Sequence, residues 1–178
     1  MSIGPSALMM LFDKIHLYPD FPKEGILFRD ISPLLADKAA FQIASHGLDI
    51  MADEFEKFDT VACVESRGFL FGPIIALNKV SGIVMIRKKN KLPGKKFSKL
   101  SKLEYGEELL EVAQGMVGNT VLIVDDVLAT GGTSKTVAEM MTVCGAKVVG
   151  FLFLLEIPGL GGRGELEKVA PVWSLITK

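Results

Sequence analysis

The stretch that decides the fold is Val121-Leu122-Ile123-Val124-Asp125-Asp126-Val127-Leu128-Ala129-Thr130-Gly131-Gly132-Thr133. It opens with four apolar residues, a run too short for a helix but suited to a buried strand of a parallel sheet. Two adjacent carboxylates follow, and we expect the strand to end at them. The segment from Ser134 to Val143 has helical character. The pattern predicts a strand, a small-residue turn and a helix, which is the repeating unit of an α/β fold.

The turn in this stretch has the composition of an anion-binding site. Gly131 and Gly132 let backbone N–H groups approach a phosphate, and the hydroxyl groups of Thr130 and Thr133 can donate hydrogen bonds. The dipole of the following helix favours negative charge at the N-terminal end of that helix. We therefore expect the turn that begins at Ala129 to bind a phosphate group.

Asp125 and Asp126 are unexpected beside a phosphate, because like charges repel. The pair is explained if the ligand carries other groups next to its phosphate, such as sugar hydroxyls or a bound Mg²⁺. Neighbouring residues of a strand point to opposite faces, so the two side chains are expected to have different roles. The alternative is an ordinary strand, turn and helix in which an aspartate caps the helix.

Length and composition indicate one compact, soluble domain spanning residues 1–178. Of these residues 49% are hydrophobic, and the net charge of −1 at pH 7 gives no general reason to expect nucleic-acid or membrane binding. No signal peptide and no apolar run long enough to span a bilayer is visible. Cys63 and Cys144 lie in apolar surroundings without Cys-x-x-Cys spacing, which indicates free thiols in a cytoplasmic protein.

Predicted strands and helices alternate along the rest of the chain, which indicates a mainly parallel sheet covered by helices on both faces. The clearest helix is predicted over 36–58, where apolar residues recur every three or four positions and Asp37 stands near the start. Further helices are predicted over 5–14, 69–79 and 134–143, and shortly before Lys168. Further strands are predicted over 60–64, 82–86, 148–155 and 172–176.

A second polar turn follows the predicted strand 60–64 and repeats the first arrangement. Its sequence is Glu65-Ser66-Arg67-Gly68. Ligands of open α/β sheets bind at the carboxyl ends of the strands, so the two turns predict two anion subsites. Arg67 suits a pyrophosphate, because a guanidinium binds phosphate oxygens through paired donors. The alternative is a surface arginine beside a helix.

The segment before the main pattern is predicted to lie over the sheet as an appendage. Ile26–Ile31 has the composition of a short strand or extended arm. Phe28 and Arg29 could line a flat apolar slot in which backbone groups contact the edge of a ring. The alternative is that Phe28 packs in the core and Arg29 forms a surface ion pair.

Positive charge is concentrated between Arg87 and Lys102, where eight basic residues and no acidic residue occur. Residues 90–96 have loop composition, and 103–106 with 109–112 predict a β-hairpin that turns near Gly106. A basic loop flanked by short strands is typical of a lid that excludes water. The alternatives are a solvated charged surface and an RNA-binding patch, although Phe97 is the only aromatic residue in the run.

A Gly-x-Gly-x-x-Gly sequence occurs at Gly159-Leu160-Gly161-Gly162-Arg163-Gly164. It follows Pro158 near the end of the chain, with too few residues left for a βαβ unit and the acid that would bind a ribose. We interpret it as a glycine-rich loop and not as a dinucleotide-binding fingerprint.

The chain resembles the type I phosphoribosyltransferases, because Val124–Thr133 is similar to their signature for phosphoribosyl diphosphate (PRPP). Four further blocks, in the expected order, resemble the adenine phosphoribosyltransferases within that family. They are Phe21-Pro22-x-x-Gly25-Ile26-Leu27-Phe28-Arg29-Asp30-Ile31-Ser32-Pro33-Leu34, Glu65-Ser66-Arg67-Gly68-Phe69-Leu70-Phe71-Gly72, Arg87-Lys88-x-x-Lys91-Leu92-Pro93-Gly94 and Leu103-Glu104-Tyr105-Gly106. The resemblance implies the type I phosphoribosyltransferase fold, with an N-terminal hood over 1–35 and a flexible β-hairpin lid over 87–106.

The resemblance also implies a function in purine salvage. The expected reaction transfers the phosphoribosyl group of PRPP to adenine and gives AMP and diphosphate. The expected cofactor is Mg²⁺, held mainly by PRPP or diphosphate and water, with no metal ligand directly from the protein. The expected state is a cytoplasmic homodimer whose other partners are small-molecule substrates, with no nucleic acid and no membrane.

The family assigns a role to each matching position. The adenine pocket would contain Leu27, Phe28 and Arg29, and the ribose hydroxyls would face Asp125 and Asp126. The 5′-phosphate would bind Ala129, Thr130, Gly131, Gly132 and Thr133, and the pyrophosphate would bind Ser66, Arg67, Arg87 and Lys91. The catalytic residues would be Glu104 as acid/base, Arg67 at the leaving group and Tyr105 closing over the site. A carboxylate such as Glu104 can accept the proton that adenine loses on ring-nitrogen alkylation.

Three positions depart from the family pattern. Some members have Asp in place of Glu65, many have Ala in place of Ser66, and many have Tyr in place of Ser101, which we expect in a lysine-rich loop. Two alternative functions stay open. One is a non-catalytic regulator that senses PRPP or a nucleotide on the same fold, and the other is a phosphoribosyltransferase for another purine base.

Overall fold

A computed structural model describes residues 3–103 and 106–178 of the chain. Its main feature is a seven-stranded sheet in the order β5-β6-β4-β3-β7-β8-β9. The strands are β3 (Thr60–Val64), β4 (Gly82–Lys88), β5 (Lys96–Leu103), β6 (Gly106–Ala113), β7 (Thr120–Leu128), β8 (Lys147–Glu156) and β9 (Val172–Thr177). Strands β4, β3, β7, β8 and β9 are parallel, whereas β6 is antiparallel to β4 and β5. The predicted α/β fold with a mainly parallel sheet is confirmed.

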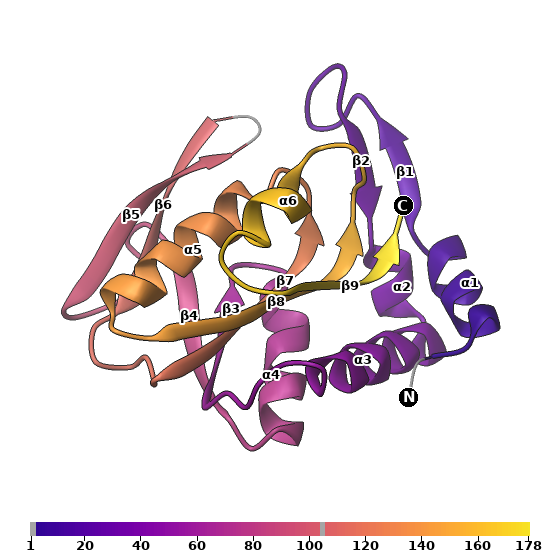
Figure 1. Ribbon diagram of the computed structural model, residues 1–178. Coiled ribbons are helices and arrows are strands. Elements are labelled where there is room, and N and C mark those ends of the chain that lie inside the picture. The colour runs from indigo at the N-terminus through magenta and orange to yellow at the C-terminus, as the bar shows by residue number, and fades with distance from the viewer. Residues whose placement is uncertain (1–2, 104–105) are drawn as a thin grey trace.

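Helices cover both faces of this sheet (Figure 1). Helices α3 (Lys38–Ala52) and α4 (Gly68–Asn78) lie on one side, and α5 (Gly132–Val143) and α6 (Gly162–Leu166) lie on the other. Phe71 of α4 belongs to the core on the first side, and Met141 of α5 belongs to the core on the second. Burying such a side chain contributes roughly 1.5–3 kcal/mol, so the two cores hold the helix ends in place at the edge of the sheet.

The uninterrupted apolar runs were predicted with the best accuracy. Strand β3 has the predicted bounds, and all five of its residues are buried. Strands β4, β8 and β9 extend the predicted segments by one or two residues at one or both ends. A strand that is covered on both faces is apolar throughout, and this makes it visible in the sequence.

The helix predicted over 36–58 is shorter than expected. Helix α3 ends at Ala52, and Asp37 precedes it as its N-cap, with Oδ1 accepting bonds from the Ala39 and Ala40 amides at 3.0 and 3.1 Å. Phe55 and Phe58 continue the apolar spacing, but they lie in the following loop and pack against the core from there. The spacing therefore identified core contacts and overestimated the helix.

Strand β7 does not end at the two aspartates, so that prediction was wrong. It continues through them to Leu128 and stays paired with β8, as far as Leu128 opposite Glu156. The partner strand is ten residues long and offers backbone hydrogen-bonding groups beyond the apolar run. Asp125 and Asp126 therefore have the geometry of strand residues.

The predicted hairpin exists, but its first strand was misplaced. Residues Lys96–Leu103 form β5 and pair along their whole length with Gly106–Ala113 of β6. Ser101, expected in a loop, is a fully buried residue of this strand. Lys99 pairs with Glu139 of α5 at 2.8 Å. The high lysine content concealed a strand that packs on a helix.

The N-terminal segment forms a separate small layer of four elements. These are α1 (Pro5–Asp13), β1 (His16–Pro19), β2 (Leu27–Asp30) and α2 (Ser32–Ala36). Strands β1 and β2 are antiparallel, with Tyr18 opposite Phe28. β1 and α2 were not predicted, because the prolines of this region were interpreted only as breakers. The β1–β2 and β5–β6 hairpins rise on the two sides of the carboxyl ends of the parallel strands (Figure 1).

In the part of the chain that the structure describes, no helix combines the length and apolar character needed to cross a bilayer. Both cysteines are free, as predicted. Burial raises the pKa of the Cys63 thiol to about 12, and the nearby Asp125 carboxylate acts in the same direction. Such a thiol is a poor nucleophile, so Cys63 is a packing residue.

Candidate functional site

The two predicted anion-binding turns lie at the same edge of the sheet. Strands β3 and β7 are adjacent and parallel, so the turns that follow them meet there. Arg67, in the turn after β3, places Nε 2.7 Å from Oδ2 of Asp126 on β7. Arg87, near the end of β4, donates from Nε to Oε2 of Glu65 at 3.0 Å. Three strand ends thus contribute to one site.

The two aspartates have different partners, as expected for neighbours on a strand. Oδ1 of Asp125 accepts the backbone N–H of Asp126 at 2.9 Å, whereas Asp126 contacts Arg67. Burial raises the pKa of Asp125, and the adjacent Asp126 charge raises it further. Burial also raises the pKa of Asp126, and Arg67 opposes that rise. The pair resists carrying two negative charges until cationic or hydroxyl groups join it.

The turn after β7 provides backbone donors at a helix start. Helix α5 begins at Gly132, and Gly131 before it has φ of +78°, a left-handed conformation that favours glycine. Among the described residues, no side chain caps this end of α5. The first N–H groups of a 12-residue helix are therefore available for an anion, and the helix dipole assists.

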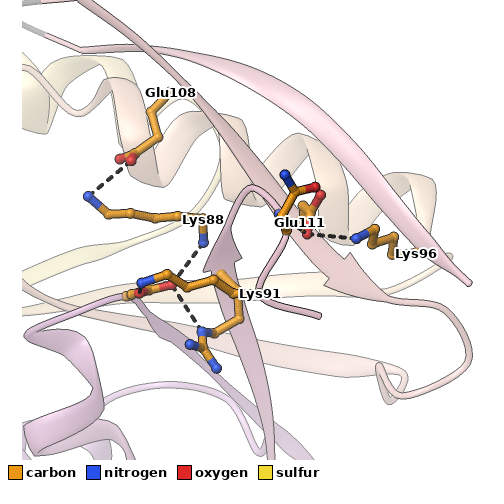
Figure 2. A network of polar contacts seen from close by, with 8 residues as sticks. Lys88, Lys91, Lys96, Glu108 and Glu111 are labelled. Atoms are coloured by element: carbon orange, nitrogen blue, oxygen red, sulfur yellow. Dashed lines mark hydrogen bonds and ion pairs between the residues drawn. The ribbon is translucent and has the colours of Figure 1, made fainter. Parts of the chain in front are cut away.

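Glu65 accepts hydrogen bonds from donors at the end of β4 and from Lys91 in the loop after it (Figure 2). Its Oε2 accepts bonds from Arg87 Nε at 3.0 Å and from the Lys88 backbone N–H at 2.9 Å, and its Oε1 accepts one from Lys91 Nζ at 2.6 Å. Burial opposes ionisation of this carboxyl group, but the bond from Lys91 and the other two outweigh it and lower its pKa to about 2. Glu65 therefore stays charged at physiological pH.

A second carboxylate stabilises the other end of this basic segment. Glu111 of β6 is buried, and its Oε2 lies 3.1 Å from Lys96 Nζ and 3.1 Å from the Asn90 backbone N–H. Figure 2 shows this pair beside the contact of 3.0 Å between Lys88 and Glu108. Carboxylates from the turn after β3 and from β6 thus neutralise a segment that has no acidic residue of its own. A purely solvated charge run, one of the alternatives, does not describe the segment.

An aromatic cavity lies between the N-terminal layer and Arg67. It has a volume of about 440 Å³. Its lining residues are Tyr18, Phe21, Phe28, Asp30, Ser32 and Arg67. The Phe21 and Phe28 rings meet edge to face, with centroids 5.1 Å apart. A flat heteroaromatic ring would have aromatic faces to contact and carboxylate and hydroxyl groups at its edge.

The predicted slot residues divide between the cavity and its support. Phe28 lines the cavity, so the alternative of a core phenylalanine was wrong. The Arg29 side chain donates to the carbonyl groups of Lys178 at 2.8 Å and Leu27 at 2.9 Å, and it forms no ion pair with any residue that the structure describes. Lys178 in turn donates from Nζ to the Phe12 and Ile15 carbonyls at 2.8 and 3.0 Å. These bonds fasten the slot segment to the end of β9.

Arg67 connects the cavity to the aspartates. Its guanidinium lies over the Phe28 ring, 5.6 Å from the centroid, while Nε contacts Asp126. About a third of its side chain remains exposed. The alternative of a plain surface arginine was therefore wrong. The guanidinium occupies the junction at which ring, sugar and phosphate groups of a ligand would meet.

Sequence reasoning missed four residues of the cavity, which are Tyr18, Phe21, Asp30 and Ser32. The signal that could have revealed them is the Pro-Asp-Phe-Pro sequence at 19–22, which lies between two short aromatic segments. This pattern is typical of a β-hairpin, and the two segments do pair as β1 and β2. Ser66 lies in the β3 turn beside Arg67, and its carbonyl oxygen accepts the Phe69 backbone N–H at 3.3 Å. Glu104 and Tyr105 lie outside the described residues.

Known proteins match the chain over most of its length. The family described as the phosphoribosyl transferase domain matches residues 32–178. The adenine phosphoribosyltransferase of Nitrosopumilus maritimus is 44% identical over 168 residues, which are 90% of this chain and 95% of that protein. The family match over residues 32–178 and the 95% coverage of this relative are the grounds for assigning the family.

Solved structures agree with this assignment. The crystal structure of the Rhodothermus marinus adenine phosphoribosyltransferase has a TM-score of 0.89 and 36% identity, and covers 98% of this chain and 100% of that one. A second structure is that of the Saccharomyces cerevisiae enzyme complexed with an imino-altritol bisphosphate and adenine. It has a TM-score of 0.88 and 37% identity, and it covers 96% of this chain and 99% of that one. The chain therefore belongs to the phosphoribosyltransferase family, and within that family to the adenine phosphoribosyltransferases.

Proposed function

We propose that the protein transfers the phosphoribosyl group of PRPP to adenine and releases AMP and diphosphate, a reaction of purine salvage. One observation supports this most strongly: the Arg67 guanidinium joins an aromatic cavity to two aspartates that precede an anion-binding helix start. Base, sugar and phosphate subsites are thus contiguous, in the order of the groups in AMP. Relatives of which 93–97% is covered have this activity in their names.

The base subsite is assigned to the cavity of the N-terminal layer. Phe28 stacks on adenine, and backbone groups near Leu27 and Arg29 contact the ring edge. The bonds from Arg29 to Leu27 O and Lys178 O support this role, because they fix that backbone without filling the cavity. In this division the chain is one domain, with residues 1–35 as a hood over the base and 87–106 as a lid.

The sugar and its 5′-phosphate are assigned to β7 and its turn. Asp125 and Asp126 accept bonds from the two ribose hydroxyls, and Ala129, Thr130, Gly131, Gly132 and Thr133 hold the phosphate at the start of α5. The raised pKa values of the aspartates support this, since hydroxyl donors stabilise the ionised forms. Binding of the diol then requires Arg67 to leave Asp126.

The leaving diphosphate is assigned to Ser66, Arg67, Arg87 and Lys91. Displacement at the anomeric carbon builds positive charge on the sugar and negative charge on the diphosphate, so cations at the leaving group lower the barrier. Hard oxygen ligands suit Mg²⁺, and a site with one or two carboxylates usually leaves the ion to phosphates and water. When bound there, Mg²⁺ supplies charge neutralisation of the diphosphate.

Glu104 and Tyr105 complete the proposed site, and their roles rest on the family resemblance alone. Glu104 is assigned the proton that adenine loses when its ring nitrogen bonds to the sugar. Tyr105 closes over the substrates. In the sequence both residues follow Leu103, the last residue of β5, in the hairpin that packs on α5.

A homodimer is proposed on a patch of exposed apolar side chains. Leu77 and Val80 at the end of α4 are 79% and 94% exposed, and Ile83 and Met85 of β4 are each 45% exposed. Val84 and Ile86 face the core beside α5, so the alternating residues Ile83 and Met85 face the α4 side, where they stay partly exposed. Exposed apolar patches of this kind mark interfaces. A second copy placed there approaches Arg87 on the same strand.

The function is tested by offering four purines together. The purified protein is supplied with PRPP, Mg²⁺ and equal concentrations of adenine, hypoxanthine, guanine and xanthine, and the nucleotide products are measured by mass spectrometry. We expect AMP to dominate. Another nucleotide as main product would assign another base. Ligand binding without any nucleotide product, from folded protein, would favour the regulator.

Replacing Asp126 by Asn tests the sugar subsite. The variant keeps the shape but removes an ionised acceptor, and hydrogen bonds to charged groups contribute about 1.5–3 kcal/mol, so PRPP affinity should fall about 10- to 100-fold. Calorimetric titration with PRPP and Mg²⁺ measures this. The control is Asp59→Asn, which disturbs the Asn119 and Thr120 bonds at the opposite end of the sheet. Unchanged affinity in folded Asp126→Asn would refute the diol assignment.

Replacing Glu65 by Gln tests the arrangement of the leaving-group cations. Without the charge, Arg87 and Lys91 lose their common partner, and misplaced groups should lower kcat on the order of tenfold. The control is Glu108→Gln, whose partner is Lys88 on the outer side of the network.

The pH dependence of this contribution follows from the pKa of about 2, below the ordinary value of 4.5. The stabilisation by ionised Glu65 is complete above the ordinary value and is lost only as pH falls toward 2. The kcat ratio of wild type to Glu65→Gln should therefore stay constant between about pH 5 and 8. Equal losses of kcat in Glu65→Gln and Glu108→Gln would show that Glu65 has no special role in placing these cations.

The dimer patch is tested with Ile83→Asp. A charge in an apolar interface is costly, so this variant should sediment as a monomer where the wild type sediments as a dimer. The control is Val143→Asp on α5, where the side chain is 62% exposed and remote from the patch. A dimer that survives Ile83→Asp would place the interface elsewhere.

A further inference from the structure

The glycine-rich segment Gly159–Gly164 has no role in the function proposed so far. Its first half lies in the loop between β8 and α6, and its second half begins α6 at Gly162. Figure 1 shows α6 beside α5, over the end of β7. The segment therefore lies behind the turn to which the 5′-phosphate is assigned.

Gly162 touches this turn backbone to backbone. A Cβ atom added at Gly162 would lie 2.2 Å from the carbonyl oxygen of Ala129 and 2.8 Å from the backbone N of Gly131. Conversely, a Cβ added at Gly131 would lie 3.0 Å from the carbonyl oxygen of Gly162. Carbon atoms do not approach backbone oxygen as closely as 2.2 Å, so any side chain at position 162 must push the turn or α6 aside.

Helix α6 cannot easily give way, because three sets of contacts fix it. Leu166 is fully buried in the core beside α5. Arg163 donates from Nε to Glu156 Oε1 at 2.9 Å and from Nη1 to the Val172 carbonyl at 2.7 Å, which joins α6 to the ends of β8 and β9. Glu165 pairs with Lys135 of α5 at 2.9 Å. When a side chain is added at position 162, the turn 129–133 is therefore expected to move more than α6.

We infer that Gly162 is a positioning residue for the 5′-phosphate, an inference that rests on the proposed function. Its bare backbone supports the outer side of the turn 129–133 and keeps the first N–H groups of α5 in place for the phosphate. The glycine-rich segment thus serves phosphate binding from behind, without touching the ligand. The base cavity is built by a different part of the chain, so its affinity does not depend on Gly162.

The test compares Gly162→Ala with Gly164→Ala. Both substitutions add one methyl group to α6. At Gly164, apart from its chain neighbours and the backbone of α6 itself, no described atom lies within 4 Å of the added Cβ. Displacing binding groups by about 1 Å costs up to 100-fold, so Gly162→Ala should raise the KM for PRPP about 10- to 100-fold. The KM for adenine should stay within about twofold, since the rearranged groups do not contact the base. Gly164→Ala should leave both KM values unchanged.

Direct binding isolates the phosphate subsite. Ribose 5-phosphate lacks the diphosphate, and its dissociation constant should rise by the same factor in Gly162→Ala. Equal PRPP and ribose 5-phosphate affinities in folded Gly162→Ala and wild type would overturn the inference. So would parallel changes in the KM values for PRPP and adenine, because these would indicate a general loss of structure.

A measurement on the unmodified chain covers the case in which Gly162→Ala fails to fold. Hydrogen exchange is followed with and without saturating ribose 5-phosphate. We expect slower exchange in residues 128–136 and also in 157–166, with no change in the hood residues 16–21. Protection of 128–136 alone would overturn the inference. Wild-type protein that binds no ribose 5-phosphate would instead contradict the proposed function.

Discussion

The contact of 2.7 Å between Arg67 Nε and Asp126 Oδ2 holds the site together. It connects the turn after β3 to the strand β7, and the same guanidinium covers Phe28 of the N-terminal layer. Burial raises the pKa of Asp126, and the Arg67 guanidinium opposes that rise. The contact is also temporary in the proposed reaction. A diol at the aspartates and a diphosphate beside Arg67 provide new partners for both charges, so substrate binding separates the pair without leaving either charge buried alone.

Counter-charges from distant parts of the sequence make the basic segment possible. Eight positive charges in sixteen residues would repel one another in an isolated peptide. In the folded chain, Glu65 of the β3 turn and Glu111 of β6 bond to its side chains and backbone. The two carboxylates fix the path of the segment and leave Arg87 and Lys91 at the edge of the site. The length of Glu65 matters here, because one side chain reaches three donors. This gives a physical meaning to one of the departures from the family pattern.

The sequence predicted the fold class because β3 and β8 are apolar throughout and are separated by segments with helical spacing. It also predicted which turns meet, since parallel strands place their carboxyl ends at one edge. The prediction from the sequence was wrong where the same residue pattern is compatible with two structures. Phe55 and Phe58 have helical spacing but pack from a loop, and β5 is a lysine-containing strand in which Lys99 pairs with Glu139 of α5. The cavity residues Tyr18 and Asp30 were missed because a hairpin brings them together, and local composition carries no information on that pairing. The contact of Gly162 with the phosphate turn was equally invisible, because it joins two backbones.

The most direct test of the account is a crystal structure of the protein with PRPP and Mg²⁺ bound. The account predicts the ribose hydroxyls within hydrogen-bonding distance of Asp125 and Asp126, the 5′-phosphate at the start of α5, and Arg67 moved from Asp126 to the diphosphate. PRPP bound away from the two aspartates, or an Arg67–Asp126 contact that persists at 2.7 Å beside bound PRPP, would contradict it.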